Sequence, residues 1–191
     1  SENYQVRTCV DLSQQALDAA RKKIGDRGEF HCGSFLDVAL EPNSFDCAIS
    51  LHTIYHMPRD RQEDAVRKLL DVVRPGSPVL IVYTNPGALT GILAGPLRTA
   101  RTFLRRGGGD ELYVYAHPNH WWRRFEDVAD LQILPWRSLP TPYQKLLVPN
   151  NALGSKLLKQ LFDLEDRFPK FFARYLQYPM IILKKKVISA D

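Results

Sequence analysis

Titratable side chains follow two stretches of this sequence that have the composition of β-strands. Asp11 comes directly after the β-branched and aromatic residues 4–10, and His52 and His56 come after the apolar residues 45–51. A carboxylate at the end of a strand can accept hydrogen bonds from both hydroxyls of a ribose, although the same position also suits a helix cap. Histidine titrates near neutral pH, so either ring could take a proton from a substrate or have a structural role only.

A second group of candidate side chains lies between residues 113 and 122. Rings with one polar edge could close over a bound acceptor, or could pack this segment onto the sheet. Two of its histidines stand three residues apart, as metal ligands on a helix do, but Pro118 disfavours a helix there and no further ligand is apparent. We therefore expect no metal. The residues of this group are Tyr113, Tyr115, His117, His120, Trp121 and Trp122.

The elements that would position these residues alternate between strand and helix in the first half of the chain. Strands are predicted over residues 4–10, 29–32, 45–51 and 79–83, with helices over residues 13–23 and 61–73 and a loop over 36–44. This order predicts a parallel sheet with right-handed crossovers, and the nearly all-apolar run 45–51 predicts a strand covered on both faces. The inner helix faces are predicted to carry Leu12, Ala16, Ala20 and Ile24 in the first helix, and Ala65, Leu69, Val72 and Val73 in the second.

The second half of the chain is less regular. We predict a helix or two short helices over residues 88–106, a loop over 113–122, a strand over 131–134 ended by Pro135, a helix over 155–162 and a last strand over 178–184. Six apolar side chains near the end of the chain are expected in the core, with contact to a lipid-like substrate or a membrane surface as the alternative. They are Leu161, Phe162, Phe168, Phe171, Phe172 and Tyr175. The whole is interpreted as one domain, residues 1–191, with a helical and aromatic insertion at about 86–130.

Composition and charge exclude several classes of protein. The chain has 191 residues, 45% of them hydrophobic and 25% charged, which is ordinary globular usage, and its apolar runs are too short to cross a bilayer. Residues 1–95 carry a net charge of −2 and residues 96–191 one of +7, but the positive charges are scattered, so we expect a solvated basic face and no nucleic acid. Three cysteines without a C-x-x-C spacing predict buried thiols, a reducing compartment and a cytoplasmic location.

Three ordered blocks of the sequence carry a family resemblance. They are VDLSQQALDAARKK, FHCGSFLDVALEPNSFDCAISLHTIYHM and RKLLDVVRPGSPVLIVYTNP, which together cover roughly residues 5–86. The chain thereby resembles the class I, Rossmann-like methyltransferases that depend on S-adenosylmethionine. The resemblance implies an α/β fold with a mostly parallel sheet, helices on both faces and an antiparallel last strand, and the final block YPMIILKKK agrees with this.

The resemblance also implies roles for particular positions. Asp11 would bind the ribose hydroxyls of the cofactor, with Leu12 packed on the adenine and Ser34 and Phe35 against the adenine edge. Ser50, Leu51 and His52 would line the pocket near the methionine portion and the reacting methyl group. Thr84 and Asn85 would face the substrate, together with Tyr115, His117, His120 and Trp121, and His52 and His56 are the candidate bases.

Two departures from the family pattern stand out. Ser34 occupies a position that is commonly acidic in the family, and the glycine-rich loop that follows the family's first strand is not found in this sequence. On this alignment a strand, the loop and a helix, about 40–60 residues at typical element sizes, would precede Ser1. We therefore expect an N-terminally incomplete fold in which another chain, such as a second copy, or a rearranged strand pairing completes the sheet.

The resulting prediction is methyl transfer from S-adenosylmethionine to a small-molecule acceptor by in-line displacement, with proximity and orientation as the main catalytic device. Two alternatives stay open. The chain could be a catalytically inactive fragment or binding module with this fold, or a nicotinamide-dependent oxidoreductase, which would share the acid at the strand end. An antiparallel last strand would favour the methyltransferase over the oxidoreductase.

Overall fold

The computed structural model describes residues 4–89, 113–137, 144–145, 148–175 and 177–187. The chain forms two compact units, residues 1–42 and residues 43–191, and each is described by itself. The helix predicted at residues 88–106 falls mainly outside the described residues, as does much of the predicted insertion.

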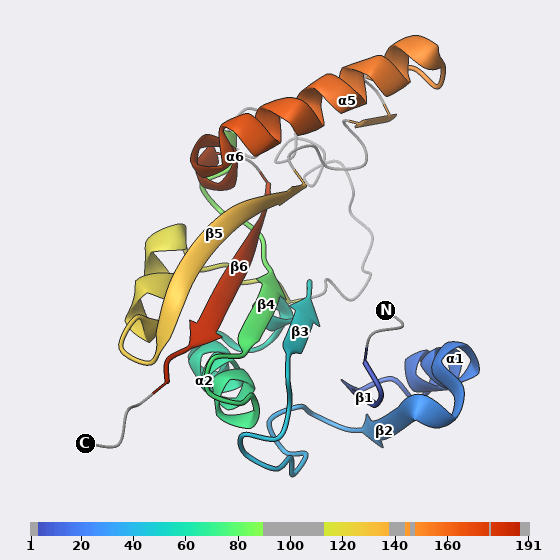
Figure 1. Ribbon diagram of the computed structural model, residues 1–191, viewed down its shortest axis with the longest axis vertical. Coiled ribbons are helices and arrows are strands. Elements are labelled where there is room, and N and C mark those ends of the chain that lie inside the picture. The colour runs from blue at the N-terminus through green and yellow to red at the C-terminus, as the bar shows by residue number, and fades with distance from the viewer. Residues whose placement is uncertain (1–3, 90–112, 138–143, 146–147, 176, 188–191) are drawn as a thin grey trace, which may run out of the picture. The chain divides into compact units, whose positions relative to one another are not determined.

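The first unit is a β-α-β element. Strand β1 (Arg7–Asp11) and strand β2 (Gly28–Cys32) pair in parallel, with Asp11 beside Cys32. Helix α1 (Gln14–Ile24) and the short 3-10 helix η1 (Gly25–Arg27) connect them (Figure 1). The strand, helix and parallel pairing predicted for this part of the chain are confirmed.

Local chemistry explains both ends of α1. The Ser13 hydroxyl accepts a hydrogen bond from the Ala16 amide at 3.2 Å, which caps the N-terminus. Gly25 ends the helix with φ +65°, a conformation that glycine adopts without steric cost. The predicted inner face was wrong in detail, because Leu17 is the buried side chain of α1, whereas Leu12 is 78% exposed.

The second unit is built on a four-stranded sheet in the order β3-β4-β6-β5. Strands β3 (Ala48–Leu51) and β4 (Pro78–Val82) are parallel, while β6 (Tyr178–Lys185) is antiparallel to both β4 and β5 (Ala129–Arg137). This arrangement confirms the mixed α/β fold and the antiparallel last strand. Within the described residues, the strands of the two units form separate sheets.

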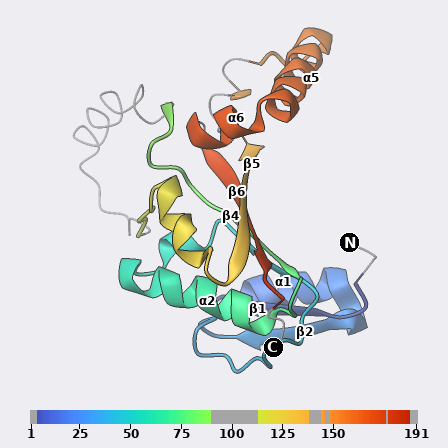
Figure 2. The ribbon, with the colours of Figure 1, turned by 60° about the vertical axis from the view of Figure 1, so that its left-hand side comes forward.

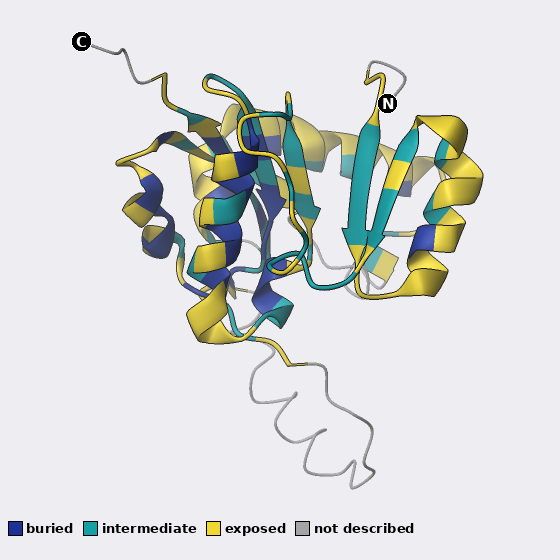
Figure 3. Ribbon diagram, turned by 90° about the horizontal axis from the view of Figure 1, so that it is seen from below, coloured by how far each residue is buried: buried dark blue, intermediate teal, exposed yellow. Residues whose placement is uncertain are grey.

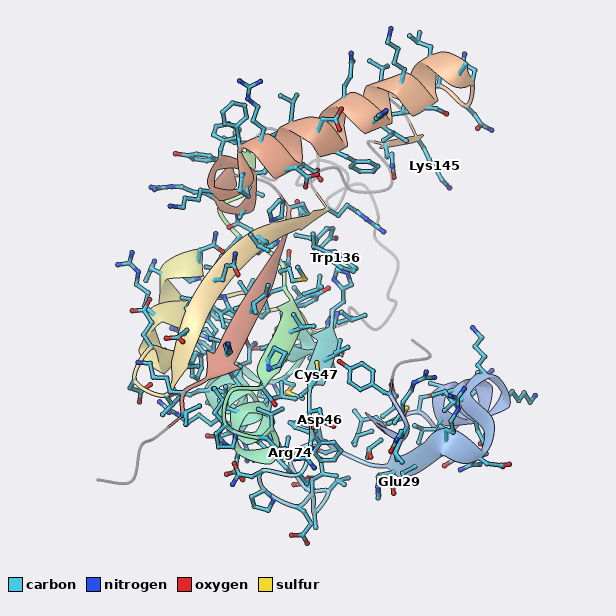
Figure 4. The ribbon with its side chains drawn as sticks, in the orientation of Figure 1. Glu29, Asp46, Cys47, Arg74, Trp136 and Lys145 are labelled. Carbon is cyan, nitrogen blue, oxygen red and sulfur yellow. The ribbon has the colours of Figure 1, made fainter. Side chains whose placement is uncertain are left out.

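Helix α2 (Gln62–Val72) covers part of this sheet. Two 3-10 helices precede it in the chain, η2 (Ile54–His56) and η3 (Arg59–Arg61), and α2 begins directly after η3. The 3-10 helix η4 (Asn119–Phe125) lies on the same side of the sheet (Figure 2). After α2 the chain returns to the sheet through a turn, in which Arg74 pairs with Asp46 (Figure 4). The core of the unit includes Val79, Ile81, Tyr83, Trp122, Phe125, Ile181 and Leu183, all with essentially no exposed surface.

Two further helices lie beyond the ends of β5 and β6, namely α5 (Ala152–Arg167) and α6 (Pro169–Tyr175) (Figures 1 and 2). Asn151 caps α5 by accepting a hydrogen bond from the Gly154 amide at 3.0 Å. The helix predicted at residues 155–162 is therefore longer than expected, because its true cap lies upstream.

Several details of the sequence prediction were wrong. Strand β5 runs through Pro135, which sits at an irregularity of the β5–β6 register where its missing N–H is tolerated. The predicted loop 113–122 contains the start of η4. In β3, Ile49 is 58% and Leu51 is 50% exposed, so the described elements cover one face of this strand and not both. Cys32 is exposed and Cys9 and Cys47 are half-buried, so the thiols are not uniformly buried.

Candidate functional site

His52 lies at the carboxyl end of β3 in an unusual backbone conformation. Its φ is +57°, which costs free energy for any residue with a Cβ, and its amide donates to the Val82 carbonyl at 3.1 Å. Its Nδ1 is 3.0 Å from the Tyr55 hydroxyl, and the Tyr178 ring stands edge-on at 4.9 Å. The strand end, the tyrosine and β6 therefore hold this imidazole in one orientation.

The surroundings of His52 favour its neutral form. Burial lowers the pKa of His52, and the positive charge of Arg137 and the nearby His56 lower it further. Burial also raises the pKa of Tyr55, with a further contribution from Tyr178, so the Tyr55 hydroxyl keeps its proton at neutral pH. When Nδ1 donates to the Tyr55 oxygen, the Nε2 lone pair is left to accept a proton.

The second predicted base, His56, is held differently. Its Nδ1 is 2.9 Å from the Tyr113 carbonyl oxygen, and its ring lies 4.4 Å from the Tyr55 ring. A ring nitrogen facing a carbonyl must carry the proton, so Nδ1 is a donor here. His56 thus links η2 to the chain near residue 113.

A buried hydrogen-bond network is centred on Tyr83, whose ring lies 5.6 Å from the Tyr55 ring. The Tyr83 hydroxyl donates to Gln62 Oε1 at 2.6 Å and accepts from the His117 amide at 3.1 Å. Gln62 Nε2 in turn donates to the carbonyls of Met57 and Tyr115 at 3.1 and 3.0 Å. Burial raises the pKa of Tyr83 to about 12, so this phenol stays a neutral donor.

The aromatic segment forms a stack beside this network. His117 and Trp121 are stacked at 4.2 Å with nearly parallel rings, and the Arg124 guanidinium lies 4.7 Å from the Trp121 ring centre. Burial lowers the pKa of His117, and its Nε2 has no hydrogen-bond partner among the described residues. Tyr115 carries the Arg59 guanidinium over its ring at 4.7 Å.

A hollow of about 360 Å³ opens at this stack. A second hollow, of about 320 Å³, shares part of its lining. Together the two hollows are lined by four residues predicted to contact substrate, Tyr115, His117, His120 and Trp121. The sequence interpretation missed the charged side chains that line the first hollow. These are Arg59, Asp60, Glu63 and Arg124, and Glu63 is bound by Arg124 at 2.5 Å and by Arg67 at 2.9 Å, which lowers the pKa of Glu63.

Thr84 and Asn85 follow β4, as predicted, but both already have partners in the protein. Asn85 is 5% exposed, donates to the Arg174 carbonyl at 2.8 Å and accepts from the Gly87 amide at 3.0 Å. The Thr84 hydroxyl accepts from Gln177 at 3.4 Å. Asn85 therefore joins the end of β4 to α6, and Thr84 is the more accessible of the two.

In the first unit, the carboxyl ends of β1 and β2 bring four predicted cofactor residues together. The Gly33 amide donates to the Asp11 carbonyl at 3.0 Å, which places Ser34 and Phe35 next to Asp11 and Leu12. Asp11 Oδ1 accepts from the Ser13 amide at 2.8 Å, so this carboxylate does shape the helix start. Its second oxygen, Oδ2, has no hydrogen-bond partner within the described part of the chain.

The remaining two predicted cofactor residues, Ser50 and Leu51, lie in β3 of the second unit. They pair with Ile81 and Val82 of β4, directly before the His52 turn. No group of three His, Cys, Asp or Glu side chains with metal-binding geometry occurs among the described residues. Nor is any of the described helices long and apolar enough to span a membrane.

Comparison with known proteins relates part of the chain to methyltransferases. Residues 2–81 match the family model of a methyltransferase domain. This match covers less than half of the chain, and together with the structural likeness below it relates the chain to methyltransferases that depend on S-adenosylmethionine. A search of curated protein sequences gave no match.

Solved structures share the fold of this chain at low sequence identity. A SAM-dependent methyltransferase from Archaeoglobus fulgidus aligns with a TM-score of 0.56 and 13% identity, over 93% of this chain and 75% of that one. Phosphoethanolamine N-methyltransferase 2 from Haemonchus contortus, solved with S-adenosyl-L-methionine, aligns with a TM-score of 0.54 and 16% identity, over 94% of this chain and 43% of that one. The [4+2]-cyclase SpnF aligns with a TM-score of 0.55 and 16% identity, over 98% and 68%. Because that fold also serves a cyclase, the likeness alone does not specify the reaction.

Some residues of the His52 site were missed by the sequence interpretation. Tyr55, Tyr178 and Gln62 come from η2, β6 and α2, and Arg137 comes from the end of β5. Tyr55 could have been noticed, because it lies three residues after His52, but nothing in the spacing relates His52 to residues more than eighty positions away.

Proposed function

We propose that this protein transfers a methyl group from S-adenosylmethionine to a small-molecule acceptor, with His52 as the base that takes the acceptor's proton. The cofactor supplies an electrophilic methyl group on a sulfonium centre. The observation that carries the proposal is the His52 turn itself, in which a strained backbone and the Tyr55 hydroxyl hold a neutral imidazole at the end of a parallel strand.

In this proposal the chain acts mainly by holding the reactants in line. Asp11 binds the ribose hydroxyls through its free Oδ2, with Leu12, Ser34 and Phe35 at the adenine and Ser50 and Leu51 at the methionine portion. The exposure of Leu12, an apolar side chain next to a carboxylate at the end of β1, supports this assignment. Proximity and orientation then supply most of the rate, and a base is needed only where the acceptor arrives protonated.

Acceptor binding is assigned to Thr84, Asn85, Tyr115, His117, His120 and Trp121. Thr84, Tyr115 and His120 retain exposed surface, while His117, Trp121 and Asn85 are largely buried and would position the others. The hydrogen bond from the Tyr115 amide to the Tyr55 carbonyl, at 2.9 Å, supports grouping this segment with the His52 site. A cytoplasmic location, and a second copy that completes the sheet, also remain predictions.

Calorimetric titration with S-adenosylmethionine and S-adenosylhomocysteine tests the proposal. We expect saturable binding of both, and Asp11→Asn should weaken it by about tenfold or more, the loss expected when a charged hydrogen-bond acceptor is replaced. The asparagine keeps an oxygen for the Ser13 amide, so the helix start is preserved. Asp18→Asn, which changes an exposed acid on α1, is the matched control and should bind like the wild type.

The outcomes separate the proposal from its alternative. Absence of binding by the wild-type chain would contradict cofactor binding by this protein and favour a binding module with a methyltransferase-like fold. Once an acceptor is found, His52→Gln should lower the rate for a hydroxyl acceptor while leaving cofactor affinity unchanged. Loss of affinity without loss of rate would remove His52 from the role of base.

A further inference from the structure

Two arginine side chains line both hollows beside the His117–Trp121 stack, and each is held over an aromatic ring. The Arg59 guanidinium lies 4.7 Å from the Tyr115 ring centre, and the Arg124 guanidinium lies 4.7 Å from the Trp121 ring centre. A guanidinium carries five N–H donors, and packing over a ring supplies no oxygen acceptor for them. The rings therefore position both cations without satisfying their hydrogen bonds.

The two arginines differ in what else binds them. Arg124 donates to Glu63 Oε2 at 2.5 Å and to the Trp121 carbonyl at 3.2 Å. Arg59 has neither a carboxylate partner nor a side-chain hydrogen bond within the part of the chain that the structure describes. A positioned guanidinium with unused donors at the edge of a hollow is suited to bind a carboxylate or phosphate group through two parallel hydrogen bonds.

The acidic side chains near the hollows leave the second hollow positive. Glu63 is bound by Arg67 at 2.9 Å as well as by Arg124, and Glu63 and Asp60 line the first hollow but not the second. The lining of the second hollow contains no carboxylate and consists of Arg59, Tyr115, His117, Pro118, His120, Trp121 and Arg124. With two arginines and no acid in its lining, the second hollow attracts negative charge.

His117 supplies an independent reason to expect a ligand. Its side chain lines both hollows and is 7% exposed, and its Nε2 has no hydrogen-bond partner among the described residues. A buried polar atom without a partner costs free energy, which a bound group that pairs with it would recover. The site thus combines unused donors with an unsatisfied ring nitrogen, as a polar binding site without its ligand does.

From these observations we propose that the two hollows form a subsite for an oxyanion, the carboxylate or phosphate group of a small molecule, with Arg59 as its main partner and Arg124 and His120 beside it. The volume is enough for such a group with a small part of the molecule that carries it. The proposal rests on the proposed function in one respect, since we take the carrier molecule to be the methyl acceptor. The hydrogen bond from the Tyr115 amide to the Tyr55 carbonyl joins this lining to the residue that holds His52.

Titration with inorganic phosphate and, separately, with acetate tests the subsite, at constant ionic strength and with tryptophan fluorescence as the readout because Trp121 is in the lining. We expect saturable binding of at least one anion, with a dissociation constant on the order of 1 mM. Arg59→Gln should raise this constant by about tenfold or more, and Arg59→Lys, which keeps the charge but not the two parallel donors, should raise it less. Arg123→Gln is the matched control, since Arg123 is an exposed arginine next to Arg124 that lines neither hollow, and it should bind like the wild type.

The two anions identify the group, because a preference for phosphate assigns a phosphate and a preference for acetate assigns a carboxylate. No saturable binding of either anion, or equal binding by the wild type and Arg59→Gln, would overturn the subsite. Circular dichroism verifies that each variant is folded.

Titration with S-adenosylhomocysteine separates this proposal from the proposed function. Arg59→Gln should bind S-adenosylhomocysteine like the wild type, since Arg59 is not among the residues assigned to the cofactor. A wild-type chain that binds an oxyanion but not S-adenosylhomocysteine would keep the subsite and contradict methyl transfer. Binding of S-adenosylhomocysteine without an oxyanion would overturn the subsite alone, and equal loss of both ligands in Arg59→Gln would overturn the assignment of Arg59 to the oxyanion.

Discussion

Helices α1 and α2 have the same length and the same place in a β-α-β element, yet they are stabilised differently. Each has 11 residues and connects two parallel strands. Helix α1 has a side-chain cap at Ser13 and a glycine at its end but buries one residue, Leu17. Helix α2 has no side-chain cap and buries Gln62, Ala65, Val66, Leu69, Leu70 and Val72. Local hydrogen bonds define the first helix, whereas packing defines the second (Figure 3).

The largest effect that would test this contrast comes from a matched pair of leucine truncations. Leu70→Ala should lower the free energy of unfolding by about 2–5 kcal/mol, because Leu70 is 4% exposed among other buried side chains. Leu17→Ala should cost less, at about the lower end of that range, since its half-exposed surroundings can relax into the space. Urea unfolding of both variants measures the difference. Equal losses would show that α1 depends on packing as much as α2 does.

The next effect concerns the polar part of the α2 core. Tyr83→Phe leaves Gln62 Oε1 and the His117 amide without their phenol partner in the interior, and should cost about 1–3 kcal/mol. Tyr55→Phe removes a hydroxyl whose partner, His52, is only partly buried, and should cost less. Thermal unfolding followed by circular dichroism distinguishes them. If the two variants lost equal stability, the Tyr83 network would contribute no more to the packing of α2 than the partly buried Tyr55 hydrogen bond does.

A smaller effect tests the caps. Ser13→Ala should destabilise the protein by about 1 kcal/mol, because the Ala16 amide loses its acceptor. Arg61→Ala changes the corresponding position of α2, where the side chain makes no cap hydrogen bond, and should be nearly neutral. Hydrogen exchange of the first-turn amides in each helix provides the readout. We expect Ser13→Ala to speed exchange in the first turn of α1. If Arg61→Ala speeded exchange in the first turn of α2 as much or more, the contrast between the two helices would be contradicted.

The smallest effect is on titration rather than on stability. Arg137→Gln should move the pKa of His52 upward toward the ordinary value of 6.5, because the Arg137 charge is one of the causes that lower it. The fold favours the neutral ring, so stability is lost as the pH falls below 6.5, and the variant should lose less of it. NMR titration of the His52 ring protons measures the shift. An unchanged pKa would mean that burial and the nearby His56, and not Arg137, lower the pKa of His52.

The strands and helices that carry strong local signals were predicted well. The helices predicted over residues 13–23 and 61–73 and the strands predicted over residues 45–51 and 79–83 all lie close to observed elements, and the antiparallel last strand that the family resemblance implies is found as well. Errors came where distant parts of the chain intervene. Pro135 continues a strand because it sits at a register irregularity opposite β6, and Ile49 and Leu51 stay exposed because no described element covers them.

The residues of the candidate site also fall into those that the sequence predicts and those that only the fold brings together. Asp11, Ser34 and His52 were predicted because each lies at or just after the end of a strand, and strand ends are where parallel sheets bind ligands. The partners that orient His52 were not identified, since Tyr178 and Arg137 reach it only through the pairing of β4, β5 and β6. Likewise, the stack of His117 on Trp121 depends on how η4 packs, which spacing in the chain does not specify.

Short-range chemistry in this chain therefore determines which segments are helix or strand and which side chains stand at their ends, because caps, turns and periodicity act within a few residues. Folding decides which face of each element is buried. The lowered pKa of His52 and the raised pKa of Tyr83 depend in turn on desolvation and on the groups that folding brings close. Those quantities arise from contacts between residues far apart in sequence, and only the tertiary structure determines them.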